Sequence, residues 1–443
     1  MKQITLLFSL LIFIFQAHAQ EALSLSKAIE IGLENNFQVK IAETQIEIAT
    51  NNNDWGVAGK YPTVDLSLSN DNTYSNTNNP VSFIPEINSV STGFVPAVNA
   101  NWVLFDGYRV RFTKQQLETL ETQSKIDAKI AVEGVIRDIM LAYYAAVLQQ
   151  EQLLVIEEVL ELSRDRINYQ EVRKEFGQAG TFDVLQTQDA FLNDSTSYLL
   201  QQTNVQNAMR NLQLAMGVDE VGQSYGLTDE LNIPTESYEL NNLRSKLLSN
   251  NFNIQRLAIN RELANINTKL QESTRSPTVS LGSGASYNWR LSGGSGTTNN
   301  GETLSFDAIT AQTLSFNIGF TVSYRLFDGG VRKRNIQNAK LSEMNAQYNI
   351  DELKRSAIAQ LETTLNTFNN QKSVIAVTDD LLQNARENLV IAEERFRGGL
   401  ITSFDYRTIQ LNFINASQSR LNAIFNLKNT ETELVRLIGG LVR

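Results

Sequence analysis

Leu104-Phe105-Asp106-Gly107 recurs 222 residues later as Leu326-Phe327-Asp328-Gly329, and this repeat sets the layout of the whole chain. Two further glycine pairs keep the same offset: Gly177 with Gly399, and Gly217 with Gly439. Upstream the offset falls to 215, where Pro62-Thr63-Val64 corresponds to Pro277-Thr278-Val279. The chain is therefore an internal duplication, and its two copies differ in length in one segment only.

The segment before each repeated Phe-Asp-Gly alternates between apolar and polar residues. In Thr313–Leu326 every second residue from Leu314 onward is apolar, and the residues between are Thr, Ser, Asn, Gly or Arg. A period of two predicts a β-strand with one apolar and one polar face. The pattern predicts four strands, over about residues 63–70, 97–104, 278–289 and 313–326. We expect polar loops over residues 71–93 and 290–312, and we assign the seven-residue length difference to them.

A long segment without proline follows each repeated glycine. Residues 108–176 and 330–398 are rich in Leu, Ile, Ala, Gln, Glu, Lys and Arg, which favour helix, and predict two helices about 100 Å long. Two apolar stripes along the first indicate packing on both sides, as in a wall of helices. Shorter helices are expected over residues 182–216 and 404–438. A long dimeric coiled coil would explain these helices but not the strands.

These elements divide the chain into parts. We expect a signal peptide, a first repeat, a polar connector and a second repeat at residues 1–19, 20–216, 217–238 and 239–443. The signal peptide is indicated by Lys2, an apolar core from Ile4 to Phe15, and Ala17-His18-Ala19 as cleavage site. An uncleaved anchor is the alternative, but the core is too short to span a bilayer.

The composition excludes most catalytic chemistry. The chain has no cysteine, and its one histidine, His18, lies in the expected signal peptide. The mature chain therefore lacks Ser-His-Asp and Cys-His sites, zinc sites built on His or Cys, and haem ligation by either residue. We expect no catalytic residue, no cofactor and no metal site, although a carboxylate-only enzyme or a calcium site stays open. A net charge of −10 argues against nucleic acid as a partner.

Four strands in one chain cannot form a closed barrel. An open sheet in lipid would leave the N–H and C=O groups of its edges unpaired, at several kcal/mol each. Closure must therefore come from other copies of the chain. Two copies give eight strands, which side chains fill, whereas three give twelve and leave room for a lumen. A homotrimer is the smallest assembly that makes a conduit.

The duplicated unit, the strand hairpins, the long helices and the Phe-Asp-Gly turns together resemble the TolC family of outer-membrane efflux channels. The resemblance covers essentially the whole mature chain. It implies a mainly helical chain with membrane β-strands, whose trimer forms a 12-stranded barrel continuous with an α-helical barrel in the periplasm. It also implies that shorter helices near residues 41–58 and 254–273 stack on the returning helices.

The resemblance places the turns between the paired helices at the periplasmic tip, where a periplasmic adaptor (membrane fusion) protein docks. The matching residues are Gly177, Gln178, Thr181, Phe182, Asp183, Val184, Gly399, Leu400, Ser403, Phe404, Asp405 and Tyr406. From the residues alone, Gly177 and Gly399 are C-terminal helix caps, and Thr181 and Ser403 are candidate N-caps. Capping and docking are compatible roles for these turns.

Asp183 and Asp405 match the tip aspartate of the family and are candidates for a cation-attracting entrance gate. The alternative role is that of first-turn acids favoured by the helix dipole. We expect Arg395 and Arg397 either to pair with these acids and latch the closed state or to be solvated. Three residues after each acid, Gln186 and Thr408 replace an aspartate of the best-known family members.

The repeated turns at the strand ends have a structural role. We expect Phe105, Asp106 and Gly107, with Phe327, Asp328 and Gly329, to form the junction between barrel and helix. The whole pattern predicts the outer-membrane exit duct of a tripartite efflux or type I secretion system, which contacts outer-membrane lipid and an adaptor directly and an inner-membrane pump indirectly. The alternative is a secreted helical coiled-coil binding or adaptor protein without a pore.

Overall fold

The computed structural model describes residues 21–219, 225–234 and 236–442, so the expected signal peptide lies outside the described residues. The chain folds as two compact units. Unit 1 comprises the described parts of Met1–Gln45, Lys125–Arg256 and Ile350–Arg443, and unit 2 comprises Ile46–Ser124 and Leu257–Asn349. Each unit draws on both repeats of the duplicated sequence.

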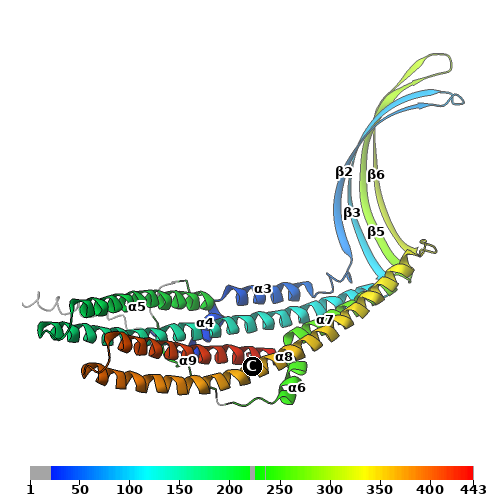
Figure 1. Cartoon of the computed structure of the whole chain (residues 1–443). Coiled ribbons are helices and arrows are strands. Elements are labelled where there is room, and N and C mark those ends of the chain that lie inside the picture. The colour runs from blue at the N-terminus through cyan, green and yellow to red at the C-terminus, as the bar shows by residue number, and fades with distance from the viewer. Residues whose placement is uncertain (1–20, 220–224, 235, 443) are drawn as a thin grey trace, which may run out of the picture. The chain divides into compact units, whose positions relative to one another are not determined.

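Unit 2 contains a four-stranded antiparallel sheet in the order β2-β3-β5-β6 (Figure 1). Its strands are β2 (Thr63–Asn78), β3 (Glu86–Phe105), β5 (Thr278–Thr297) and β6 (Thr303–Ser323). Each repeat contributes one hairpin, and β3 and β5 join the two hairpins along most of their length. Strands β2 and β6 are the two edges of the sheet and pair with only one neighbour each in this chain.

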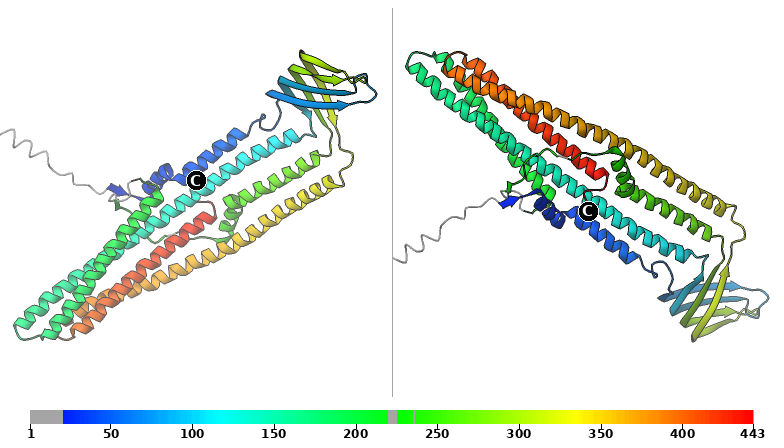
Figure 2. Two further views of the ribbon diagram at one scale, coloured as in Figure 1. Left: turned by 90° about the horizontal axis from the view of Figure 1, so that it is seen from above. Right: turned by 90° about the horizontal axis from the view of Figure 1, so that it is seen from below.

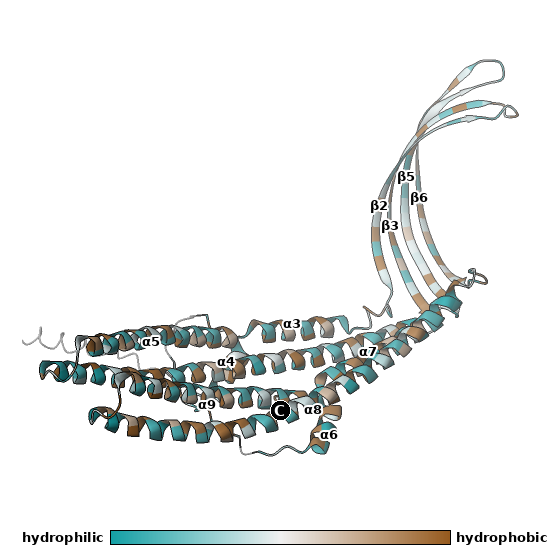
Figure 3. Ribbon diagram, in the orientation of Figure 1, coloured by the Kyte–Doolittle hydropathy of each residue, from teal (hydrophilic) through white to brown (hydrophobic). Residues whose placement is uncertain are grey.

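The register gives the sheet one apolar face across all four strands. Leu66 pairs with Val98, Val98 with Ala285, and Ala285 with Phe316. The neighbouring row on the other face contains small polar residues and glycine, and Asn99 pairs there with Gly284. Figure 3 shows the resulting alternation of hydrophobic and hydrophilic residues along the strands. The alternation expected for 313–326 thus extends across the sheet.

The strands are longer than the sequence predicts, and the expected loops over 71–93 and 290–312 are wrong for most of their residues. Only residues 79–85 and 298–302 connect the paired strands. Asn, Ser and Thr carry no hydropathy period, but their backbone groups complete the ladder and their side chains bond across it. Thr92 Oγ1 donates to Asn72 Oδ1 at 2.5 Å, and Tyr74 Oη donates to Asn88 Oδ1 at 3.1 Å.

The extra residues of the second repeat also lie elsewhere than expected. The connection 298–302 is shorter than 79–85. Strand β5 has 20 residues where β2 has 16, and residues 324–327 follow β6 outside the strand. The length difference is therefore placed in a longer strand and in the junction rather than in the turns.

Two long helices dominate the chain, α4 (Arg109–Glu175) and α8 (Val331–Arg397), with 67 residues each. In unit 1, α5 (Thr181–Met216) folds back along α4, and α9 (Ser403–Leu437) folds back along α8 (Figure 2). The shorter helices of the two repeats are α2 (Leu25–Asn35), α3 (Phe37–Asn52), α6 (Leu240–Asn250) and α7 (Phe252–Ser273). No helix in the described ranges is both long and apolar enough to cross a membrane.

One asparagine in each repeat bonds to the end of one helix and to the start of another. Asn36 connects α5 to α3, and Asn251 connects α9 to α7. Asn36 Nδ2 donates to Ala215 O at 3.0 Å and Asn36 Oδ1 accepts from Gln38 N at 2.8 Å. Asn251 Nδ2 donates to Leu437 O at 2.9 Å, and its Oδ1 accepts from Ile254 N at 3.1 Å. Each side chain therefore satisfies the last carbonyls of one helix and the first amides of another.

The described part of the connector between the repeats takes part in a small two-stranded sheet. Its β4 (Tyr225–Leu227) pairs in parallel with β1 (Glu21–Leu23). Buried Tyr143 on α4 donates a hydrogen bond to Leu23 O at 2.9 Å. Strands of three residues are too short to show a period, so no pattern in the sequence predicts this sheet.

Candidate functional site

The candidate site is the pair of turns that join α4 to α5 and α8 to α9. Gly177 and Gly399 have φ values of 70° and 71°, in the left-handed region that favours glycine. Gln178 N donates to Arg173 O at 2.7 Å, and Leu400 N donates to Arg395 O at 2.8 Å. Both glycines therefore end the long helices in the same way, as C-terminal caps.

The helices after these turns begin one residue earlier than expected. The N-caps are Gly180 and Thr402, so Thr181 and Ser403 are first helical residues and the prediction that they are caps is wrong. The tip aspartates complete both caps: Asp183 Oδ2 accepts from Gly180 N at 2.9 Å. Sequence reasoning missed these caps because it placed the helix starts one residue too late.

Asp405 is bound more closely to its turn than Asp183. Its Oδ2 accepts from Thr402 Oγ1 at 2.7 Å and from Thr402 N at 3.1 Å. These two hydrogen bonds, that of the hydroxyl first, lower the pKa of Asp405 below its ordinary value. Asp405 is exposed, so it adds a stable negative charge to the surface of the turn.

The residues expected to dock an adaptor fall into two groups. Phe182, Leu400 and Phe404 are apolar side chains that are 75%, 77% and 65% exposed. The side chains of Val184, Ser403 and Tyr406 are buried in unit 1 and hold the turns in place. The exposed apolar group, together with exposed Gln178 and Thr181, presents a surface to another protein.

The expected latch between arginines and tip aspartates does not form within the chain. Arg397 Nη2 pairs with Glu393 Oε1 on its own helix, at 2.6 Å. Arg395 is exposed to solvent. Pairs at i and i+4 on one helix form more readily than a contact across the turn, because the helix already holds them adjacent.

A different ion pair connects the two helical hairpins. Arg407 on α9 donates to both oxygens of Asp194 on α5, at 2.7 and 2.6 Å. Ser163 on α4 donates to the same carboxylate at 2.6 Å. The Asp194 side chain is only 6% exposed. The partners lie 213 residues apart in sequence, so no local pattern could have predicted this contact.

Three further polar contacts reinforce the connection. Tyr169 Oη on α4 donates to Arg397 O at 2.7 Å, and Thr187 Oγ1 lies 3.4 Å from Ser403 Oγ. Arg166 Nη1 donates to Gln410 Oε1 at 3.1 Å. Together with Asp194 and Arg407, these contacts hold α4 and α5 against α8 and α9 near the turns.

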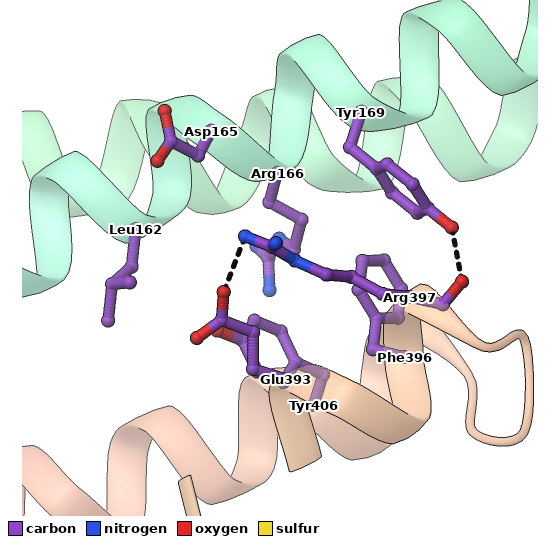
Figure 4. A pocket seen from close by; sticks show the side chains of 8 residues that line it. All are labelled: Leu162, Asp165, Arg166, Tyr169, Glu393, Phe396, Arg397 and Tyr406. Atoms are coloured by element: carbon purple, nitrogen blue, oxygen red, sulfur yellow. Dashed lines mark hydrogen bonds and ion pairs between the residues drawn. The ribbon is translucent and has the colours of Figure 1, made fainter. Parts of the chain in front are cut away.

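A cavity of about 200 Å³ lies beside these contacts (Figure 4). The side chains around it are Leu162, Asp165, Arg166, Tyr169, Glu393, Phe396, Arg397 and Tyr406. The rings of Phe396 and Tyr406 stack with centroids 5.2 Å apart. Burial, and then the nearby Arg407, lower the pKa of Arg166 to about 10. The cavity is thus part of the packed contact between the hairpins.

The strand–helix junctions in unit 2 are built from the repeated Phe-Asp-Gly. Asp328 accepts from Gly330 N and Arg332 N, both at 3.0 Å, and the Arg332 amide is the largest cause of its lowered pKa. Asp106 accepts from Val110 N at 3.4 Å. Gly107 has φ 72°, and a Cβ there would lie 2.4 Å from Ser273 O. Position 107 therefore admits only glycine, and the aspartates of both turns start the helices that follow.

Long helices in two hairpins and a membrane-compatible sheet define a class of protein, the outer-membrane channel subunit. The sequence profile described as outer membrane efflux protein matches residues 28–218 and 243–440. The chain therefore belongs to the outer membrane efflux protein family. It is an outer-membrane exit duct for efflux rather than an enzyme, with its helices in the periplasm, and nothing supports the alternative of a secreted adaptor without a pore.

Solved structures share this fold. The Campylobacter jejuni CmeC outer membrane channel is 20% identical with a TM-score of 0.73, and the match covers 95% of this chain and 86% of that one. The outer membrane protein VceC of Vibrio cholerae is 17% identical with a TM-score of 0.70, with coverage of 94% and 96%. The open-state Neisseria gonorrhoeae MtrE outer membrane channel is 17% identical with a TM-score of 0.70, with coverage of 95% and 89%. A comparison with curated protein sequences finds no match.

Proposed function

We propose that three copies of this chain close a 12-stranded barrel and form the exit duct of a tripartite efflux or type I secretion system. The observation that carries this proposal is the sheet of unit 2. Its two edge strands, β2 and β6, each have an unpaired side in the chain, and its apolar face is uncovered. Phe316, Ile318 and Phe320 are 76%, 77% and 71% exposed.

Lipid is the environment that suits this face. A β-sheet in a bilayer must pair every edge, because each unpaired backbone group costs several kcal/mol there. Pairing β2 of one copy with β6 of the next removes both edges at once and gives a ring. The opposite face carries Gly284 and small polar side chains such as Ser67 and Ser315, which suit a water-filled lumen.

The exposed residues of the turns suit a protein partner. Phe182, Leu400 and Phe404 form an apolar surface around two polar turns, and we assign the docking of a periplasmic adaptor to it together with Gly177, Gln178 and Gly399. The inner-membrane pump would be reached through the adaptor. Replacing Phe182 and Phe404 by serine should abolish co-purification of the adaptor while leaving channel conductance intact, and unchanged capture would contradict this assignment.

The contacts between the hairpins suit a gate. Three copies would bring three α4–α5 and three α8–α9 hairpins to one entrance, lined by Asp183 and Asp405. Separation of the hairpins would widen this entrance, and the Asp194–Arg407 pair opposes that separation. We therefore assign the closed state to this contact inside each chain, in which Arg397 pairs with Glu393 on its own helix.

Mass and conductance test the proposal. Purified channel in detergent should have the mass of three chains by light scattering, and it should form conducting pores in planar bilayers. A monomer or dimer that conducts would contradict the proposed stoichiometry. A trimer that never conducts, even when the hairpin contacts are broken, would contradict the duct.

A further inference from the structure

We infer that the first strand–helix junction binds the phosphate headgroup of a membrane phospholipid. A cavity of about 370 Å³ lies there, within unit 2. Its walls are aromatic and apolar, with Trp55, Trp102, Phe105 and Tyr108 among them. The inference rests on the proposed membrane position of the sheet, because the end of β3 then lies at the level of lipid headgroups.

Two cationic side chains without an ion-pair partner among the described residues line this cavity. Lys60 and Arg111 both line it and are exposed, and neither forms an ion pair with another described residue. Lys60 Nζ lies 4.5 Å from the centroid of the Trp55 ring. The one acidic side chain of the lining, Asp106, is buried and already accepts from Arg109 Nε at 3.4 Å. The free charge at the cavity is therefore positive and complements a phosphate.

The backbone at Tyr108 points to a role for its side chain. Tyr108 has φ 69° and is the one residue other than glycine with a positive φ in the described ranges. The corresponding residue of the second repeat is Gly330, with φ 79°, the residue type that such a backbone favours. Strain of this kind persists at functional sites. The first repeat keeps an aromatic ring where the fold alone would take glycine, and the ring lines the cavity.

The second repeat provides a natural comparison. Arg275 and Lys333 occupy the positions of Lys60 and Arg111, so the cations are duplicated. Two of the four aromatic residues are not, because Leu270 and Gly330 replace Trp55 and Tyr108, whereas Tyr324 and Phe327 correspond to Trp102 and Phe105. A headgroup site needs both charge and a surface for the glycerol and upper acyl chain, where Trp and Tyr are favoured at the membrane interface. The site therefore belongs to the first repeat alone.

Native mass spectrometry of the delipidated channel tests the inference. We expect phosphatidylglycerol to bind with one lipid per protomer, and diacylglycerol with the same chains, which lacks the phosphate, to bind far more weakly. Each cation should contribute roughly fivefold in affinity, so Lys60→Gln with Arg111→Gln should bind phosphatidylglycerol roughly 25-fold more weakly. The matched control, Arg275→Gln with Lys333→Gln, should bind it as the wild type does.

Tyr108→Gly tests the aromatic ring in a variant that should still fold, because glycine is the residue that the backbone at this position favours. It should weaken lipid binding without lowering the thermal midpoint. Equal binding of diacylglycerol, equal losses in the two double variants, or a lipid-free cavity covered by a neighbouring copy would each overturn the inference. The same spectra count subunits, so a failure of the trimer is seen separately from a failure of lipid binding.

Discussion

Arg407→Ala should open the channel. Arg407 donates to both carboxylate oxygens of Asp194, and no other ion pair connects α5 to α9 among the described residues. The substitution leaves Asp194, which is only 6% exposed, with Ser163 as its hydrogen-bond donor. The negative charge then favours separation of the hairpins, because separation returns it to water.

The size of the effect follows from burial. Removing one partner of a buried ion pair costs about 3–5 kcal/mol, and the partly exposed Arg407 places this pair at the lower end, about 3 kcal/mol. Such a change shifts the ratio of closed to open hairpins by roughly 150-fold. Single-channel recording in planar bilayers should show a large rise in open probability or conductance.

Arg420→Ala is the matched control. Arg420 pairs with Asp379, which joins α8 to α9 within one hairpin and does not connect the two hairpins. The control should therefore leave the conductance near that of the wild type. If Arg407→Ala conducts like the wild type, or if Arg420→Ala opens the channel equally, the assignment of the gate to the hairpin contact is refuted.

Substitutions elsewhere in unit 1 have separate expected effects. Burial raises the pKa of Glu133 from 4.5 to about 7, so the free energy of unfolding falls by about 3 kcal/mol as pH rises through this window. The thermal midpoint of Glu133→Gln should not show this decrease with pH. The thermal midpoint of the exposed control Glu157→Gln should decrease with pH as that of the wild type does. Asn251→Ala should lower stability in denaturant by about 2 kcal/mol, and Asn36→Ala, which is less buried, by about 1 kcal/mol; equal losses would contradict the dependence on burial. Asp405→Ala should lower the cation selectivity of single channels, and unchanged selectivity would defeat the charged entrance. Because Thr402 lowers the pKa of Asp405, its contribution should persist as pH falls through the ordinary range of an aspartate and be lost only below it.

The duplicated spacing was the part of the fold that sequence could predict. A period of two across Thr313–Leu326 predicts a strand, since every second side chain must face the same environment. The polar end of β2 escaped prediction, because Asn, Ser and Thr alternate with one another there and leave no hydropathy signal. Their pairing is set by the backbone ladder, which continues wherever the partner strand continues.

The candidate site was predictable only where its geometry is local. Gly177 and Gly399 end helices through bonds to residues a few positions earlier, so their role is readable from the chain. The contact of Asp194 with Arg407 depends on two hairpins packing together, and no spacing along the sequence encodes it. The sequence therefore located the turns, whereas the contact between the hairpins had to be seen in the structure, where Arg397 pairs with Glu393 and Arg395 is exposed.

Closure of the barrel between copies can be measured directly by cross-linking. The chain has no cysteine, so introduced pairs are unambiguous. Within one chain the edge strands β2 and β6 are separated by β3 and β5, roughly 14 Å, which is too far for a disulfide. Ser67→Cys would be combined in turn with cysteine at the polar-face positions of β6: Thr313, Ser315, Asn317, Gly319 and Thr321.

Oxidation in the outer membrane should link chains for at least one of these pairs, and the covalent products should end at three chains. Single-cysteine variants should give no product larger than a dimer. Failure of every pair to cross-link in a conducting channel, or covalent ladders that continue beyond three chains, would contradict the trimeric barrel.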